Sequence, residues 1–195
     1  MSTITAREST LTPEDASAMS GDILYELVDG RLVEKNLSTK STCVAARITR
    51  FLSNHCDSPL TGFVFAEHAY ACFPSKPRQM RRPDVSLILA TRMTPELFEE
   101  GVSTIRPDLV IEVVSPNDLV YDLLEKLDDY RDAGIPLVWI VYPPNRRVEI
   151  IRADATRSEL GPDGELTGED ILPGFHCRVA DLFAGLPEIK PASPG

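Results

Sequence analysis

Two short apolar segments of this chain each carry a single acidic side chain. Asp84 opens the run PDVSLILA, and Glu112 interrupts the run LVIEVV. Runs this rich in Val, Ile and Leu are typical of β-strands that are covered on both faces. Because an unpaired buried charge is strongly unfavourable, each carboxylate must hold a cation or become protonated. Together with a lysine on the following helix, Lys126, the two segments predict a metal-dependent hydrolytic site.

The length and composition fit one globular domain. The 195 residues are 43% hydrophobic and 26% charged, which is ordinary for a protein with a well-formed core. We expect a flexible lead over 1–11, a domain over 12–186 and a flexible proline-rich tail over 187–195. No apolar run approaches the ~18–20 residues of a membrane helix, and the start of the chain lacks the apolar centre of a signal peptide. These features predict a cytoplasmic protein without membrane contact.

The distribution of charge bears on nucleic-acid binding. The net charge of −10 is unfavourable for it, since phosphate groups are usually met by a basic surface. Four basic residues nevertheless lie within seven positions just before Asp84, namely Lys76, Arg78, Arg81 and Arg82. They predict phosphate contacts beside the acidic site or, equally, a solvated basic loop.

The cysteines and histidines form no metal-binding pattern. Cys43, Cys56, Cys72 and Cys177 are scattered without a CxxC pair, and the three histidines are equally dispersed. A structural zinc site needs closely spaced ligand pairs. We therefore expect reduced, mostly buried thiols and histidines that are not ligands.

Turn residues and periodicity predict the order of helices and strands. The pair Asp29–Gly30 between two alternating runs indicates a hairpin over 24–36. The predicted helices are a short one after Thr12, 39–54, a short one over 94–101, and 118–133. The predicted strands are 62–73, 84–90, 108–114, 137–142 and 146–152. A loop or loosely paired hairpin follows over 153–170, and the chain returns to the core over 171–183.

The helical period places Lys126 relative to the strand before it. On that strand, Val110, Glu112 and Val114 share one face. At about 100° per residue, Lys126 lies at the edge of the apolar arc of the helix and faces the sheet. A lysine at such an edge could equally extend to water.

This set of side chains favours a hard cation. Mg²⁺ binds a few carboxylates together with waters and phosphate oxygens, and Mn²⁺ is the expected substitute. A nearby lysine can orient or deprotonate the attacking water and offset charge on the scissile phosphate. The expected catalytic residues are therefore Asp84, Glu112 and Lys126, with Mg²⁺ as the cofactor.

Four segments carry a resemblance to a known family: YELVDGRLVE, RRPDVSLI, PDLVIEVVSPND and EKLDDYRDAGIPLVWIVYP. From about Thr12 to Phe183, the chain resembles the Uma-type putative restriction endonucleases, small bacterial proteins with the PD-(D/E)XK nuclease fold. The resemblance implies an α/β (α+β) fold with a restriction-endonuclease-like mixed central β-sheet flanked by helices. It also implies that Asp84 and Glu112 bind the metal ion together with the backbone carbonyl of Val113.

The chain departs from the general nuclease motif at Val114, where E-x-K expects a lysine. In the family the lysine usually comes from the next helix, and Lys126 matches that position. Glu26 matches the family's early acidic residue, and Glu67 resembles an acid on the strand before Asp84. Either glutamate could extend the metal shell, or simply cap or pair.

The sequence leaves more than one function open. The first is a Mg²⁺-dependent endonuclease that hydrolyses DNA phosphodiester bonds, and RNA stays open as a substrate. The second is a catalytically weak or idle binding module that keeps the nuclease fold and acts as a dimer or through a partner. The acidic total favours the second, whereas the complete set of Asp84, Glu112 and Lys126 favours the first. A third, hydrolysis of a small phosphate ester, would also fit the acidic surface.

The apolar hairpin over 137–152 bears on self-association. One of its faces is expected to stay uncovered once the core of so small a domain is closed. Because exposed apolar strips tend to be interfaces, this hairpin predicts a homodimer, most simply a two-fold one.

Overall fold

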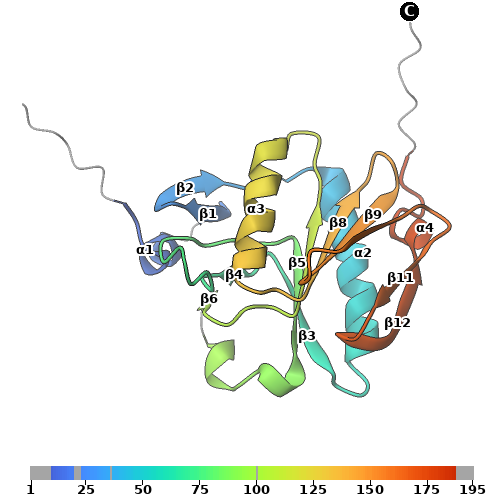
Figure 1. Ribbon diagram of the computed structural model, residues 1–195, viewed down its shortest axis with the longest axis horizontal. Helices are drawn as coiled ribbons and strands as arrows, with labels where there is room; N and C mark the ends of the chain where they lie inside the picture. The colour runs from blue at the N-terminus through green and yellow to red at the C-terminus, as the bar shows by residue number, and fades with distance from the viewer. Residues whose placement is uncertain (1–9, 20–22, 36, 100, 188–195) are drawn as a thin grey trace, which may run out of the picture.

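A mixed β-sheet forms the centre of the molecule (Figure 1). The structure, a computed structural model, describes residues 10–19, 23–35, 37–99 and 101–187. Most of the predicted lead, and the predicted tail from residue 188 onward, lie outside the described residues. The six-stranded sheet has the order β10-β9-β8-β7-β5-β3, in which β7 and β8 are parallel and all other neighbours are antiparallel.

The elements follow the predicted order along most of the chain. The strands of the main sheet are β3 (Gly62–Ala66), β5 (Val85–Leu89), β7 (Leu109–Val113), β8 (Leu137–Tyr142), β9 (Arg147–Arg152) and β10 (Arg157–Leu160). The described residues also form two-stranded pairs: β1 (Tyr25–Val28) with β2 (Arg31–Glu34), β4 (Ala69–Tyr70) with β6 (Val102–Ser103), and β11 (Glu165–Gly168) with β12 (Leu172–Arg178). The helices are α1 (Pro13–Ala18), α2 (Thr39–Cys56), α3 (Val120–Asp132) and α4 (Val179–Leu182). None of the helices described is long and apolar enough to span a membrane.

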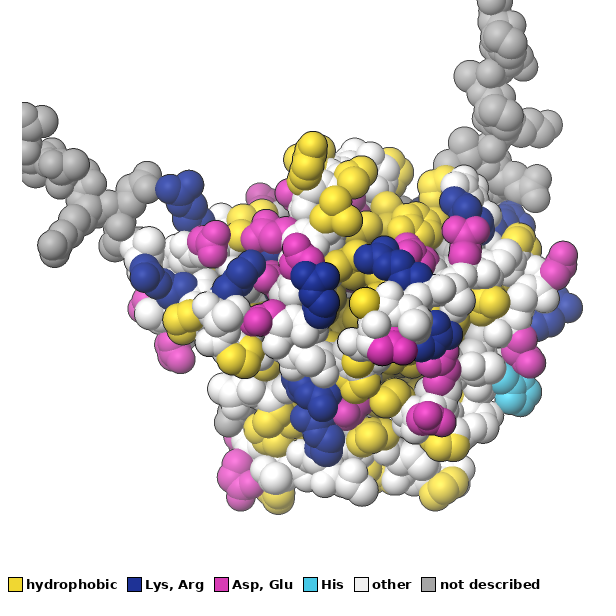
Figure 2. All heavy atoms as spheres, in the orientation of Figure 1, with side chains coloured by type: hydrophobic (Ala, Val, Ile, Leu, Met, Phe, Trp, Pro, Cys, Tyr) yellow, Lys and Arg dark blue, Asp and Glu magenta, His cyan; other side chains and the backbone are white. Residues whose placement is uncertain are grey.

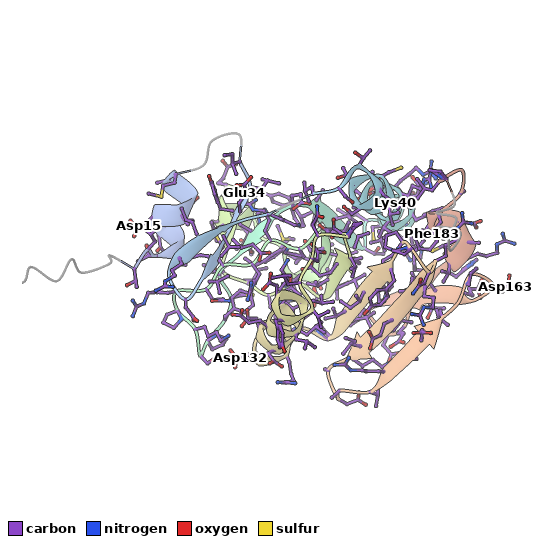
Figure 3. All side chains as sticks on the ribbon, turned by 90° about the horizontal axis from the view of Figure 1, so that it is seen from above. Asp15, Glu34, Lys40, Asp132, Asp163 and Phe183 are labelled. Carbon is purple, nitrogen blue, oxygen red and sulfur yellow. The ribbon has the colours of Figure 1, made fainter. Side chains whose placement is uncertain are left out.

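The two longer helices cover opposite faces of the sheet. Seen from above, α2 and α3 lie on either side of the strands (Figure 3). On one face, Ile48 of α2 belongs to the same buried cluster as Ile111 of β7. On the other face, Tyr130 of α3 clusters with Val110 of β7. This confirms the predicted alternation along β7 and puts Glu112 on the face that α3 covers.

The β7–α3–β8 crossover carries a helix over the acidic strand. β7 and β8 are parallel, with Leu109 opposite Leu137, so the chain must cross the sheet between them. It does so through α3, and the chain then turns at Gly134, whose φ of 67° is readily adopted only by a residue without a Cβ. The predicted helix over 118–133 is thus confirmed, and its inner side lies against β7.

The β1–β2 hairpin is attached beside the main sheet as a separate pair. Both residues of its turn, Asp29–Gly30, have positive φ angles of 50° and 80°, as a two-residue type I′ turn requires. Backbone hydrogen bonds run in both directions between Leu27 and Met80, at 2.9 and 2.8 Å. The confirmed hairpin therefore places residues from the start of the chain next to the segment that leads into β5.

The predicted strand over 62–73 is wrong in its second half. The chain turns at Glu67, whose φ is 52°, and the short strand β4 then pairs with β6 instead of the main sheet. A left-handed residue interrupts the alternation of side chains along a strand. The predicted alternation of side chains along 62–73 therefore ends at Glu67.

Two other predicted segments also differ. Over 94–101 only a 3-10 turn forms, Glu96–Phe98, and residue 100 lies outside the described residues. The segment 153–170 contains β10 and β11, which do not pair with each other. β10 extends the main sheet beside β9, and β11 pairs with β12. Each of the two strands therefore pairs with a strand that lies just outside this segment, β9 before it and β12 after it.

The apolar hairpin over 137–152 is buried within one copy of the chain. Trp139 and Ile140 of β8 belong to the clusters on the two opposite sheet faces. The exposed strip from which we predicted a homodimer is therefore absent from this fully described segment, because both faces are covered. Exposed apolar side chains lie instead at the start of α3, namely Leu119, Val120, Tyr121 and Leu124, and Figure 2 shows hydrophobic side chains over the upper end of this helix. The dimer itself stays a prediction.

Candidate active site

Asp84 and Glu112 come together at the ends of two adjacent strands. β5 and β7 are antiparallel neighbours, with Val85 opposite Ile111. One residue further along this register, Asp84 faces Glu112 from the same side of the sheet. Each residue is only 5% exposed, and both line the same pocket. The predicted adjacency of the two strands is confirmed, whereas the role of the two carboxylates as metal ligands stays a prediction.

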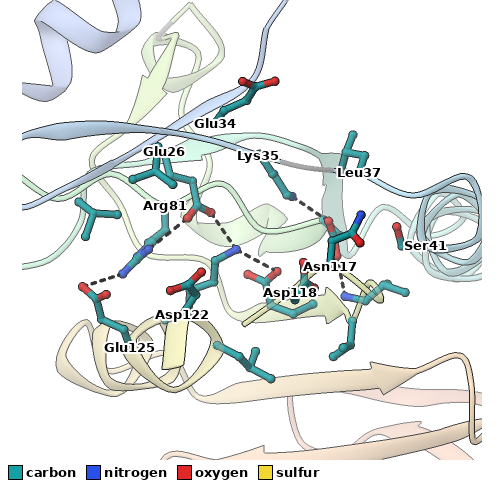
Figure 4. Close-up of a pocket in the computed structure, with 18 residues that line it drawn as sticks. Glu26, Glu34, Lys35, Leu37, Ser41, Arg81, Asn117, Asp118, Asp122 and Glu125 are labelled. Carbon is teal, nitrogen blue, oxygen red and sulfur yellow. Dashed lines mark hydrogen bonds and ion pairs between the residues drawn. The ribbon is translucent and has the colours of Figure 1, made fainter. Parts of the chain in front are cut away.

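The pocket lies between the β1–β2 hairpin and the first turns of α3 (Figure 4). From the hairpin side, Glu26 and Lys35 reach into it, and Glu125 belongs to its α3 side. Asn117 and Asp118, between β7 and α3, complete the lining next to the two carboxylates. Three separate parts of the chain therefore meet around Asp84 and Glu112.

The Asp84 carboxylate is held at both oxygens. The backbone N–H of Val113 donates to Oδ2 at 2.6 Å, and the Lys35 ammonium lies 2.7 Å from Oδ1. Within a β-strand, the N–H and C=O of one residue point toward the same neighbouring strand. The carbonyl of Val113 thus faces the same edge of β7 as the Asp84 carboxylate, where the resemblance placed it.

The Glu112 carboxylate is enclosed by α3. The Tyr130 hydroxyl donates to Oε1 in a short hydrogen bond, and the Lys126 ammonium lies 3.5 Å from Oε2. Burial raises the pKa of Glu112 above its ordinary value, and the nearby negative charge of Asp84 adds to the rise although Lys126 opposes it. Glu112 therefore needs a cation close by to remain ionised.

Lys126 points inward, as the helical period predicted. Its ammonium lies 3.0 Å from Glu26 Oε1 as well as near Glu112. Burial disfavours the charged amine, but the two glutamates outweigh this effect and raise the pKa of Lys126. The side chain does not extend to water in the manner of a surface lysine. It is a charged group between two carboxylates, and it is therefore suited to stabilising negative charge in the pocket.

Glu26 belongs to a buried ion network that fixes α3. It accepts hydrogen bonds at 3.1 Å from both the Arg81 guanidinium and the backbone N–H of Arg82. Burial opposes its ionisation, yet Lys126 and Arg81 lower the pKa of Glu26 below its ordinary value. Glu26 is thus paired in this structure, and its part in the metal shell stays a prediction.

Arg81 connects this glutamate to the helix. The guanidinium is 2% exposed and reaches Asp129 of α3 at 2.6 Å and Glu125 at 3.2 Å. Asp129 also accepts hydrogen bonds from Gln79 at 2.6 Å and Lys76 at 2.7 Å. The segment before β5 is therefore attached to α3 through the buried carboxylate of Asp129.

The predicted basic loop is largely not a free basic surface. Arg81 is buried and Lys76 is paired with Asp129, because both face the acidic side of α3. Arg82 donates to the backbone carbonyls of Glu67 at 2.5 Å and Tyr25 at 3.4 Å. Arg78 is exposed and donates to the Thr10 hydroxyl. Three of the four side chains thus make internal contacts, and their predicted phosphate contacts stay a prediction.

Lys35 is the residue that sequence reasoning missed. Its ammonium contacts Asp84 at 2.7 Å, Glu67 at 2.6 Å and the carbonyl of Arg82 at 2.8 Å. Burial raises the pKa of Glu67 to about 7 even though Lys35 beside it favours the carboxylate. Lys35 follows an exposed hairpin strand, so nothing in the local sequence pattern indicated an inward side chain.

Three polar residues before and within α3 were also missed. Asn117, Asp118 and Asp122 line the pocket, and the Asp118 carboxylate accepts the backbone N–H of Ser115 at 2.8 Å. The segment SPND directly after an apolar strand could have indicated Asn117 and Asp118, because polar residues at strand ends often line functional clefts.

The donor set of this pocket fits a hard divalent cation. Asp84, Glu112 and the Val113 carbonyl offer oxygen atoms, and Mg²⁺ commonly binds one or two carboxylates and takes its other ligands from water and phosphate. Among the described residues, no cluster of three or more His, Cys, Asp or Glu side chains is arranged to hold a metal ion. A cation bound here would consequently keep several positions for water and substrate.

Sequence comparison decides the family. The profile of Uma2, described as "Putative restriction endonuclease", matches residues 13–180. The chain belongs to the Uma2 family. This confirms the resemblance carried by the four sequence segments. No curated protein matches the chain.

The fold of this Uma2 chain is similar to that of a solved structure. A crystal structure of a putative nuclease belonging to DUF820 from Anabaena variabilis superimposes with a TM-score of 0.77. The match covers 89% of this chain and 97% of that chain at 18% sequence identity. At this identity the likeness concerns the fold. The predicted mixed central sheet flanked by helices is confirmed.

Proposed function

We propose that this Uma2 chain is a Mg²⁺-dependent endonuclease that hydrolyses DNA phosphodiester bonds. The observation that carries the proposal is the meeting of Asp84 and Glu112 in one pocket, with the Lys126 ammonium 3.5 Å from Glu112. Two carboxylates side by side, with a backbone carbonyl nearby, are the oxygen ligands that a hard cation such as Mg²⁺ prefers. The family and the fold likeness to a putative nuclease support the same class of reaction.

Each residue of the pocket has a distinct part in this chemistry. A Mg²⁺ ion held by Asp84, Glu112 and the Val113 carbonyl would act as a Lewis acid, polarising the phosphoryl oxygen and lowering the pKa of bound water. Asp84 is oriented by the Val113 N–H, and Glu112 by the Tyr130 hydroxyl. Lys126, held by Glu26, presents a positive charge that stabilises the negative charge developing on the phosphate. The chain therefore fixes its ligands and its ammonium before substrate arrives.

The charge distribution supports weak binding of the nucleic acid. The net charge is −10, and Lys76, Arg81 and Arg82 are engaged internally. Few side chains remain to displace counterions from a phosphate backbone, which is the main source of non-specific affinity. We expect cleavage to require micromolar or higher protein rather than tight binding.

Substitution of Asp84 tests the proposal. Wild-type protein, Asp84→Asn and Arg131→Met are incubated with supercoiled plasmid, linear duplex, single-stranded DNA and RNA, with Mg²⁺, Mn²⁺ or EDTA. Arg131 is the matched control because its side chain is exposed and pairs only with Asp128 among the described residues. We expect metal-dependent cleavage of DNA that falls by about 10²–10³ in Asp84→Asn, the scale of losing one transition-state contact, and is unchanged in Arg131→Met. Cleavage by Asp84→Asn at the wild-type rate, or full cleavage in EDTA, would refute the proposal. Preferential cleavage of RNA would reassign the substrate.

A second function is favoured by a different observation. Tyr121 is 84% exposed, and Leu119 and Val120 beside it are also exposed, in the segment between the pocket residues Asp118 and Asp122. The exposed apolar side chains at the start of α3 fit a binding module that acts as a homodimer or through a partner. This alternative expects self-association without cleavage. Sedimentation equilibrium at micromolar protein that shows only the 21.5 kDa species would count against the dimer.

A further inference from the structure

Lys35 occupies the cation position next to Asp84. Its ammonium lies 2.7 Å from Asp84 Oδ1, 2.6 Å from Glu67 Oε2 and 2.8 Å from the carbonyl oxygen of Arg82. A lysine ammonium has three N–H donors, so these contacts satisfy all of them. The side chain is only 8% exposed. This is a complete and enclosed binding arrangement rather than a transient surface pair.

Both carboxylate oxygens of Asp84 already have a partner in this structure. Oδ2 accepts the Val113 N–H at 2.6 Å, and Oδ1 contacts the ammonium. A divalent cation that ligates Oδ1 would sit within a few ångströms of a second positive charge in a poorly solvated pocket. Like charges at this separation repel strongly when water is largely excluded. Direct ligation by Asp84 therefore requires the Lys35 ammonium to move.

The two lysines of the pocket contact different acidic residues. Lys126 contacts Glu26 and Glu112, at 3.0 and 3.5 Å, whereas Lys35 contacts Asp84 and Glu67. Lys126 is part of α3, which the Arg81 network fixes to the segment before β5. Lys35 directly follows β2, and the hairpin is hydrogen-bonded as its own two-stranded sheet. Of the two ammonium groups, Lys35 can withdraw without disturbing the main sheet, and Figure 4 shows its side chain reaching down from the hairpin.

We propose that Lys35 is an internal counterion that competes with the divalent cation for Asp84. In the metal-free protein it compensates the charge of Asp84 and Glu67, and it leaves Oδ1 when the cation binds. Lys35 thereby weakens metal binding and holds the metal-free pocket together. The inference rests on the proposed metal-dependent function, and it adds a regulatory residue that belongs to this chain's hairpin.

Metal affinity measured without substrate tests the proposal. Free Mn²⁺ is measured by electron paramagnetic resonance during titration of wild-type protein, Lys35→Met and Lys35→Arg. Methionine nearly keeps the length of the side chain and removes its charge, whereas arginine keeps the charge. Lys40→Met is the control for net charge, because Lys40 lies on the first turn of α2 and pairs with no carboxylate in the described part of the chain. We expect Lys35→Met to bind Mn²⁺ about 10–100-fold more tightly, the range over which groups beside metal ligands change affinity, and the other two variants to stay near wild type.

Thermal denaturation gives a second readout on the same proteins. Without metal, Lys35→Met is expected to melt below wild type, because Asp84 and Glu67 lose their cation. With saturating Mn²⁺ its melting temperature is expected to rise more than that of wild type, since tighter binding to the folded state stabilises more. Should Lys35→Met not fold without metal, Lys35→Gln replaces it, because an amide can still donate to Asp84.

The outcomes separate this inference from the proposed function. Equal Mn²⁺ affinity in wild type and Lys35→Met, or weaker binding in Lys35→Met, overturns the competition while leaving the metal-dependent function in place. Failure of both proteins to bind Mn²⁺ overturns both. Tighter binding that disappears in the double variant Lys35→Met/Asp84→Asn supports competition at Asp84 itself.

Discussion

Replacement of Arg81 by methionine removes the centre of the buried ion network. The side chain is 3% exposed and contacts Glu26 at 3.1 Å, Glu125 at 3.2 Å and Asp129 at 2.6 Å. Methionine fills a similar volume without a charge. The variant therefore leaves buried carboxylates short of their main cation, and Asp129 is fully buried.

The expected magnitude follows from the partners that remain. Removing one partner of a buried ion pair typically destabilises a protein by about 3–5 kcal/mol. Glu26 keeps Lys126 and a backbone N–H, and Asp129 keeps Lys76 and Gln79. We therefore expect the free energy of unfolding to fall by about 3 kcal/mol, the lower end of that range. For a domain of this size, such a loss lowers the melting temperature by about 6–12 °C.

Urea denaturation followed by tryptophan fluorescence measures this loss. Trp139 is the only tryptophan and is fully buried, so its emission reports unfolding of the core. Arg131→Met is the matched control, because Arg131 lies on α3 and its side chain is 66% exposed in a pair with Asp128. Such pairs contribute at most about 1 kcal/mol. The slope of unfolding free energy against urea should stay unchanged in both variants, which shows that stability rather than compactness has changed.

A double-mutant cycle identifies the source of the loss. In an Asp129→Asn background, Arg81→Met should cost clearly less than in the wild type, because the strongest unpaired charge is already gone. A loss below about 1 kcal/mol in Arg81→Met, similar to an ordinary surface substitution, would refute the reasoning. It would show that the network adds orientation without stability.

Two further predictions concern the catalytic role of Lys126 and the reactivity of the Cys72 thiol. Lys126→Ala should lose about 10²–10³ in metal-dependent cleavage rate while keeping Mn²⁺ binding, and Lys126→Arg should also be weak because a guanidinium fits a lysine pocket poorly. A Lys126→Ala protein that cleaves like wild type eliminates the catalytic role. Burial raises the pKa of Cys72 to about 12, and a raised pKa reduces the reactive thiolate. At pH 8 only about one Cys72 thiol in 10⁴ is ionised, so Cys72 should react slowly with Ellman's reagent. The fast phase of the reaction should therefore vanish in Cys43→Ser and persist in Cys72→Ser. Survival of the fast phase in Cys43→Ser contradicts this assignment.

Local sequence patterns determined the elements and one half of the site. Apolar runs covered on both faces identified β5, β7 and β8, and the pair Asp29–Gly30 identified the hairpin turn. An isolated acid in each of two apolar strands indicated that Asp84 and Glu112 meet, and the helical period turned Lys126 inward. These inferences succeeded because strand alternation and helical spacing are set by backbone geometry over a few residues.

Tertiary contacts decided which cations surround the two carboxylates, and they explain the predictions that were wrong. Lys35 and the Arg82 carbonyl are 47 residues apart in sequence, and Gln79 and Asp129 are 50 apart. No periodicity spans such distances, since these contacts join elements that lie far apart along the chain. The left-handed turn at Glu67 likewise depends on its surroundings, because a non-glycine residue adopts that backbone only where the fold compensates the strain. Sequence therefore supplied the carboxylates, and the fold decided which lysine and which arginine each of them meets.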